Sequence, residues 1–161
     1  MSPPRGLRFE DVGVGAELPQ LLRGPITTSH VMRWSAAIEN WHRIHYDQPF
    51  AVEHDGLPGL LINGTFKQHL LVQLMRGWLE PGGWLARIQM SFRGMDLVGD
   101  TLTAWGRVTE TEERDGLGLV VCEIGIRNQR DDGDTTNGTA TGVLPLRGGP
   151  AVPYPFPGLA P

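Results

Sequence analysis

The chain has 161 residues, of which 40% are hydrophobic and 20% charged, a composition typical of one soluble globular domain that buries its own core. Its 14 basic and 18 acidic residues give a net charge of −4, which excludes the basic surface of a nucleic-acid-binding protein. A single cysteine, Cys122, excludes an internal disulfide, and the N-terminus has no apolar signal segment, so we expect a cytoplasmic protein without a membrane anchor.

The first half of the chain predicts two helices. After Thr28 and Ser29, which can both cap a helix N-terminus, apolar residues expected in the core recur at helical spacing: Val31, Trp34, Ile38 and Trp41. A second helix is predicted over residues 64–79, "GTFKQHLLVQLMRGWL", where two adjacent i, i+4 rows are apolar. So wide an apolar stripe indicates a helix that is covered by more than one surface.

The second half of the chain predicts strands. Four segments with alternating apolar residues are separated by turn sequences such as "RDG" and "RDDGD": residues 84–94, 100–113, 118–129 and 135–146. An antiparallel sheet wrapped around the 64–79 helix would cover its apolar stripe. We therefore predict an α+β fold with one domain over residues 1–161, whose Pro/Gly-rich ends lie at about 1–7 and 148–161.

The segment "NWHRIHYD", residues 40–47, places His42 and His45 where they could share a metal ion. A zinc site needs at least one or two further ligands, and the nearby Asp47, His54 and Asp55 have no recognisable ligand spacing. We therefore predict no metal. The simplest alternative is that both histidines are solvated or interact with the end of a helix.

The sequence Asn63-Gly64-Thr65 leads into the predicted buried helix. The N-terminus of a helix presents unpaired N–H groups that can polarise a carbonyl oxygen, and a glycine there allows a ligand to approach the backbone. A histidine shortly before such a helix indicates half of an acyl-transforming site, with one base and one oxyanion hole.

Three stretches carry a family resemblance: "FEDVGVGAELPQ", "GPITTSHVMRWSAAIENWHRIHYDQPFA" and "GLPGLLINGTF". Over about residues 8–110 the chain resembles the MaoC-like (R-type) enoyl-CoA hydratase and 3-hydroxyacyl-thioester dehydratase family, which has the hot-dog fold. The family pattern, Asp-x-Asn-Pro-x-His-x-Asp followed by Ala-His-Gly, places the catalytic histidine on His45, the following aspartate on Asp47 and the helix-start glycine on Gly64. The wording "HRIHYD" is closer to mitochondrial 3-hydroxyacyl-thioester dehydratases and mesaconyl-CoA-type hydratases.

Two positions depart from the family pattern. Asn40 stands where the family has its catalytic aspartate, and Asn63 replaces the histidine of Ala-His-Gly. Asparagine can orient a water molecule but cannot take its proton. The resemblance implies that His45 is the base, that Asn40 holds the water and that Gly64 polarises the carbonyl. Further candidates for substrate binding are Asn63, Thr65, Arg43, Tyr46 and Asp47; for two of them the simpler prediction is another role, a solvated side chain for Arg43 and core packing for Tyr46.

The resemblance implies a lyase of fatty acid metabolism that interconverts trans-2-enoyl and (3R)-3-hydroxyacyl thioesters of CoA or acyl carrier protein, without a metal or redox cofactor. It also implies a dimer, either of two identical chains or with another MaoC-like subunit. Two alternatives stay open. The chain could be a non-catalytic subunit of a heteromer, which Asn40 and Asn63 favour, or a thioesterase, which the lack of an acidic residue in 64–79 disfavours.

Overall fold

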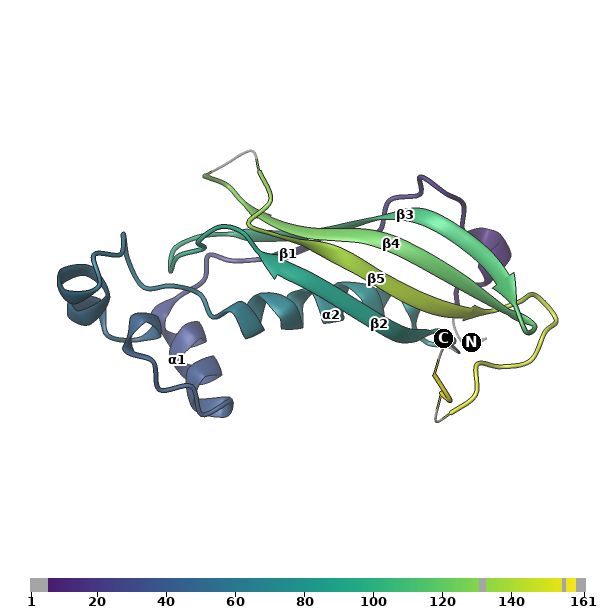
Figure 1. Ribbon diagram of the computed structural model, residues 1–161, viewed down its shortest axis with the longest axis horizontal. Helices are drawn as coiled ribbons and strands as arrows, with labels where there is room; N and C mark the ends of the chain where they lie inside the picture. Colours follow the sequence, from purple (N-terminus) through teal and green to yellow (C-terminus); the bar gives the residue numbers. More distant parts are fainter. Residues whose placement is uncertain (1–5, 131–132, 155, 159–161) are drawn as a thin grey trace, which may run out of the picture.

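The computed structural model describes residues 6–130, 133–154 and 156–158. Figure 1 shows a curved antiparallel sheet bent over one long helix, α2 (Gly64–Leu79). The strand order is β1-β3-β4-β5-β2, and this arrangement confirms the predicted hot-dog fold of the α+β class. Within the predicted Pro/Gly-rich ends, residues 1–5, 155 and 159–161 lie outside the described residues.

Helix α2 has the bounds that its apolar pattern predicts. The helix packs against the inner face of the sheet, and its buried apolar side chains come from both predicted rows: Leu70, Leu71, Leu74, Met75 and Leu79. Phe66 and Trp78 lie at the margin of the same cluster and are partly buried. The side chain of Lys67 is also buried, which the apolar pattern did not indicate.

The four predicted strands are all present, and a short additional strand joins them at one edge. Their bounds are β1 Leu21–Arg23, β2 Trp84–Phe92, β3 Leu102–Arg114, β4 Leu117–Asn128 and β5 Thr136–Pro145. Asp115 and Gly116, with φ of 53° and 75°, form the tight β3–β4 turn that suits the twist of a hairpin. Strand β2 pairs only with β5 in the described chain, so its other side is an open sheet edge.

The segment between β1 and α2, which we call the lobe (residues 25–62), lies at one end of the molecule in Figure 1. It holds α1 (Thr28–Ala37), a 3-10 turn at Arg43–His45 and a wide helical turn at Phe50–His54.

Helix α1 differs from its prediction at both ends. Its N-cap is Thr27, whose hydroxyl accepts a hydrogen bond from the His30 N–H, and not Thr28 or Ser29. The helix ends before Glu39, whose φ of 53° is incompatible with a continuing helix. Trp41 is consequently 58% exposed, so its predicted place in the core is wrong.

Candidate active site

His45 lies at the end of the 3-10 turn Arg43–His45 and is 9% exposed. Its Nδ1 is 2.9 Å from the carbonyl oxygen of Leu61. A carbonyl can only accept a hydrogen bond, so Nδ1 carries the proton and the neutral ring has its lone pair on Nε2.

Burial is the main influence on the protonation of His45. It lowers the pKa of the imidazole, and the nearby His42 lowers it further, while the hydrogen bond to Leu61 acts in the opposite direction. The net lowering keeps the ring neutral at pH 7. A neutral imidazole with a proton fixed on Nδ1 can accept a proton on Nε2, as a general base must.

The segment 60–62 connects His45 to the start of α2. The N–H of Leu61 donates to the carbonyl of Ile44 at 3.0 Å, and the Leu61 carbonyl accepts from the His45 ring. Leu61 also forms a β-bridge with Leu97. The chain then continues through Asn63 into Gly64, so the candidate base is fixed on the segment that leads into α2.

The start of α2 is tied to α1 by two side-chain hydrogen bonds. The amide of Asn63 donates to the hydroxyl of Ser35 at 3.3 Å, and the Trp34 indole donates to the hydroxyl of Thr65 at 2.9 Å. The Asn63 Oδ1 atom is buried and has no partner among the described residues. The side chain of Asn63 does not cap the helix, while its carbonyl accepts from the Phe66 N–H at 3.0 Å. Among the described residues this leaves the N–H groups of Gly64 and Thr65 for an external acceptor.

Gly64 lies directly against the ring of Phe92, the last residue of β2. A Cβ atom at position 64 would be 3.0 Å from Phe92 Cε2 and 3.1 Å from Cζ, so a larger residue could not fit without movement. An added methyl group would therefore require the Phe92 ring to move by a few tenths of an ångström, and the approach of a ligand to Gly64 stays a prediction. Sequence reasoning missed Phe92 because its contact with Gly64 depends on how β2 lies across the helix.

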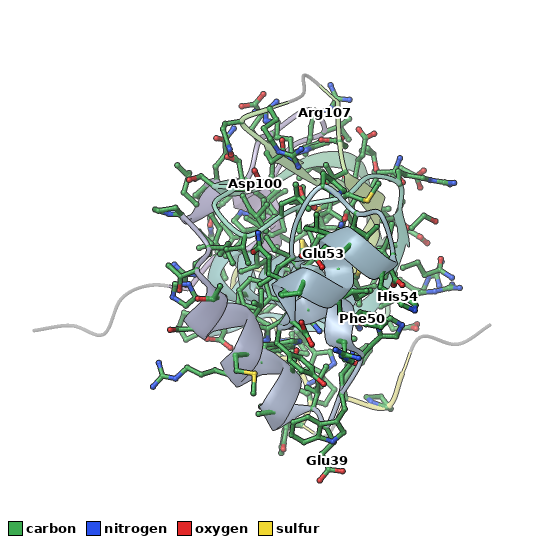
Figure 2. All side chains as sticks on the ribbon, turned by 90° about the vertical axis from the view of Figure 1, so that its left-hand side faces the viewer. Glu39, Phe50, Glu53, His54, Asp100 and Arg107 are labelled. Atoms are coloured by element: carbon green, nitrogen blue, oxygen red, sulfur yellow. The ribbon has the colours of Figure 1, made fainter. Side chains whose placement is uncertain are left out.

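Asn40 follows the C-terminal end of α1 and is half-buried. Its Oδ1 accepts a hydrogen bond from the backbone N–H of His42 at 3.1 Å, which leaves its amide NH₂ as the group able to hold a water oxygen. Glu39 offers no replacement for a catalytic carboxylate here, because Figure 2 shows it at the outer tip of the lobe, pointing away from the molecule.

The other predicted substrate-binding residues of the lobe, Arg43, Tyr46 and Asp47, interact with groups of the lobe itself. Arg43 pairs with Asp47 at 2.7 Å and lies 4.3 Å from the centre of the Phe50 ring, and this arginine holds the pKa of the Asp47 carboxyl below its usual value. The hydroxyl of Tyr46 donates to the carbonyl of Trp41 at 2.7 Å. Each of the three side chains therefore has a partner within the lobe, and a role of these residues in substrate binding stays a prediction.

The two histidines of the motif do not form part of a larger ligand cluster. Their ring centres are 6.1 Å apart, and the described residues contain no group of three or more histidine, cysteine, aspartate or glutamate residues that could hold a metal. His54 instead pairs with Asp55 at 2.8 Å and stacks on Phe50, beside which it lies in Figure 2. The prediction that no metal takes part stays a prediction.

Comparisons with known proteins indicate the class of protein. The sequence model of the hydroxyacyl-thioester dehydratase type 2 family matches residues 20–99, which include the lobe and α2. The chain is 46% identical over 46 residues to the mesaconyl-C(4)-CoA hydratase of Chloroflexus aurantiacus, a match that covers 29% of this chain and 16% of that enzyme.

Two solved structures show the same fold at low identity. The (R)-hydratase of A. caviae involved in PHA biosynthesis has a TM-score of 0.74 and 22% identity, covering 84% of this chain and 99% of that one. A chain of the ChsH1–ChsH2 complex of Mycobacterium tuberculosis has a TM-score of 0.70 and 22% identity, covering 82% and 98%. The family match and the shared hot-dog fold support the assignment of the chain to the MaoC-like hydratases and dehydratases. No helix of the described chain is long and apolar enough to cross a membrane.

Proposed function

We propose that the protein is a lyase that interconverts trans-2-enoyl thioesters and (3R)-3-hydroxyacyl thioesters. One observation carries the proposal: a neutral His45, with its Nδ1 proton held by Leu61, is fixed on the segment that opens into the N-terminus of α2. Water addition to a double bond conjugated with a thioester carbonyl requires two groups: a base for the water and N–H donors for the carbonyl oxygen.

In the hydration direction, His45 Nε2 takes one proton from water while the water oxygen bonds to C3 of the enoyl group. The electron pair of the C2–C3 double bond moves toward the thioester, and the N–H of Gly64 stabilises the negative charge that develops on the carbonyl oxygen. The proton is then delivered to C2, which restores the neutral imidazole. Dehydration is the same sequence in reverse, and neither direction consumes a redox cofactor.

Asn40 would hold the attacking water through its amide NH₂ group, because its Oδ1 is engaged by the His42 backbone. The water oxygen would then accept a hydrogen bond from Asn40 while one of its protons is directed to His45. In this arrangement His45 carries out the proton transfer alone, and Asn40 contributes orientation.

The acyl carrier in this proposal is CoA, with acyl carrier protein as the other source of the same thioester. The matched Chloroflexus protein is named as a hydratase of a CoA thioester, which supports CoA as the carrier, although the match covers little of that enzyme. The buried thiol of Cys122 suits a reducing cytoplasm, which is the location we propose.

The open edge of β2 supports a dimer of identical chains. This strand exposes Trp84 and Phe92 at its two ends and carries a single charged side chain, Arg87, so little protects the edge against pairing. Pairing of β2 with β2 of a second copy would join the two sheets and place Phe92 and the start of α2 beside the interface. Sedimentation should give a dimer at micromolar concentration, and a fully active monomer would contradict this part of the proposal.

A non-catalytic subunit of a heteromer is the second candidate, because Asn40 cannot transfer a proton as the family's aspartate does. Purified protein incubated with crotonyl-CoA and longer enoyl-CoAs distinguishes the candidates. The proposal predicts loss of the enoyl absorbance without release of free thiol. Release of thiol would indicate a thioesterase, and activity that requires an added MaoC-like subunit would move the chemistry to that subunit.

A further inference from the structure

A buried ion pair joins the first turn of α2 to the loop after β2. Lys67 and Asp96 are 3% and 1% exposed, and Nζ of the lysine lies 2.9 Å from Oδ2 of the aspartate. The Lys67 ammonium also donates to the carbonyl of Gly94 at 3.1 Å. Asp96 accepts two further hydrogen bonds, from Asn128 at 2.8 Å and from Thr135 at 2.7 Å.

The position of this lysine conflicts with local preferences. A cation in the first turn of a helix opposes the helix dipole, and the burial of two charges costs more than the burial of apolar groups of similar volume. The neighbouring residues of α2 show that apolar packing is available here, since Leu70 and Leu71 fill the adjoining space. The pair therefore has a use that apolar side chains would not serve, and that use is directional hydrogen bonding.

Asp96 connects this network to the candidate base. Its backbone carbonyl accepts a hydrogen bond from Ile62 at 2.8 Å, and Leu97, the next residue, bridges Leu61. Leu61 in turn holds the Nδ1 proton of His45. The backbone of Asp96 thus fixes the segment 60–62, which holds the His45 ring. The side chain of Asp96 fixes the first turn of α2.

Lys67 connects the network to the other half of the site. It lies one helical turn after Gly64, and its Nζ is 5.4 Å from the centre of the Phe92 ring. The edge of that ring contacts Gly64. The lysine therefore fixes both the helix start and the aromatic side chain that lies against it.

We infer that Lys67 and Asp96 are positioning residues, which hold the His45 imidazole and the Gly64 N–H in the relative orientation that water addition requires. The inference rests on the proposed function, because both groups that it orients belong to that reaction. Both side chains are buried, so neither is expected to touch the substrate. A displacement of about 1 Å between groups that act together can lower turnover on the order of 10²-fold, so a rigid connection between them has a large effect on rate.

The test is the double variant Lys67→Met with Asp96→Asn, which removes both charges at similar side-chain volume. We expect kcat to fall on the order of 10- to 100-fold while KM changes far less, because orientation is lost and binding is retained. The matched control is Arg76→Met with Glu80→Gln, which removes an exposed ion pair from the other end of α2 and should leave kcat unchanged. Circular dichroism confirms that each variant is folded.

A second readout does not depend on turnover. NMR of the His45 ring nitrogens should show a proton fixed on Nδ1 in the wild type and a mixture of tautomers in the double variant, with a pKa that rises as the ring becomes exposed. The control variant should keep the wild-type spectrum. The neighbouring His42 contributes to the lowered pKa of His45, and both variants leave His42 in place.

A milder variant covers the case in which the double variant does not fold. Thr135→Val removes one hydrogen bond from Asp96 at nearly constant volume, and it should produce a smaller change of the same kind in kcat and in the His45 spectrum. A kcat within twofold of the wild type together with an unchanged His45 spectrum would overturn the inference. A wild type inert toward enoyl thioesters would overturn the proposed function, while the His45 spectra would still decide whether the pair positions the ring.

Discussion

The sheet with α2 and the lobe of residues 25–62 are held together in different ways. The sheet and α2 share one apolar cluster, in which side chains such as Leu71, Val120 and Ile124 are fully buried. The lobe contributes Ile26, Val31 and Ile62 to the same cluster, whereas the side chains of His45 and Tyr46 are held by single hydrogen bonds, to Leu61 and Trp41. Packing therefore accounts for most of the stability of the molecule, and the base of the proposed reaction, His45, belongs to the part held by hydrogen bonds.

The largest expected effect on stability is in the core. Leu71→Ala removes a side chain that is 0% exposed and should lower the free energy of unfolding by about 2–5 kcal/mol, because a cavity remains beside α2. Ile38→Ala in the lobe truncates a side chain that is 39% exposed and should cost less than about 1 kcal/mol. Chemical denaturation of both variants measures the two losses in the free energy of unfolding. Equal losses would show that Ile38 stabilises the protein as much as a fully buried core side chain does.

The contact between Gly64 and Phe92 lies within the sheet-and-helix region, at the end of α2 that follows the lobe. Gly64→Ala should destabilise the protein by about 1–3 kcal/mol, because the added methyl group collides with the Phe92 ring. Phe92→Ala should relieve that collision, so the double variant should be more stable than the sum of the two single changes predicts. Strict additivity in denaturation experiments would mean that the ring does not explain the glycine.

Asn40 tests the chemistry of the lobe. Asn40→Ala should lower kcat less than the loss of His45, because the base can still accept the proton. Asn40→Asp should leave an active enzyme, since a carboxylate can still accept the hydrogen bond from the His42 N–H, and it should add an acidic limb to the pH profile. The pH dependence of kcat for both variants provides the measurement. An inactive Asn40→Asp variant would argue against a water-holding role.

The smallest expected effect is at Cys122. Burial raises the pKa of this thiol to about 12, so it should stay protonated at neutral pH and react slowly with iodoacetamide until the protein is denatured. Mass spectrometry of native and denatured protein compares the two rates. Rapid alkylation of the native protein would show that the sheet opens far more easily than its packing indicates.

The sequence predicted the regular region better than the lobe, for a physical reason. The apolar residues of helix α2 and of strands β2 to β5 recur at the period of a helix or a strand, so these elements can be read directly from the sequence. Trp41 continues the apolar period of α1 but lies beyond the turn at Glu39, where the backbone reverses. No local pattern marks that reversal.

The candidate site was predictable only in part. The motif around His45 and Gly64 could be recognised because it is contiguous in sequence. The connection between Lys67 and Asp96 could not, because the two residues are distant in the chain and meet only when β2 lies across α2. Phe92 is a similar case, since an exposed aromatic residue at the end of a strand has no special signal in the sequence.

The measurement that tests the central claim most directly is a comparison of His45→Ala with His42→Ala in enoyl-CoA hydration. The account predicts that His45→Ala loses on the order of 10²–10⁴-fold in kcat, as expected for a general base, and that His42→Ala loses far less. In the wild type, kcat/KM should fall as the pH drops through the lowered pKa of His45, because protonation removes the lone pair on Nε2. Equal losses at His42 and His45 would contradict the assignment of the base.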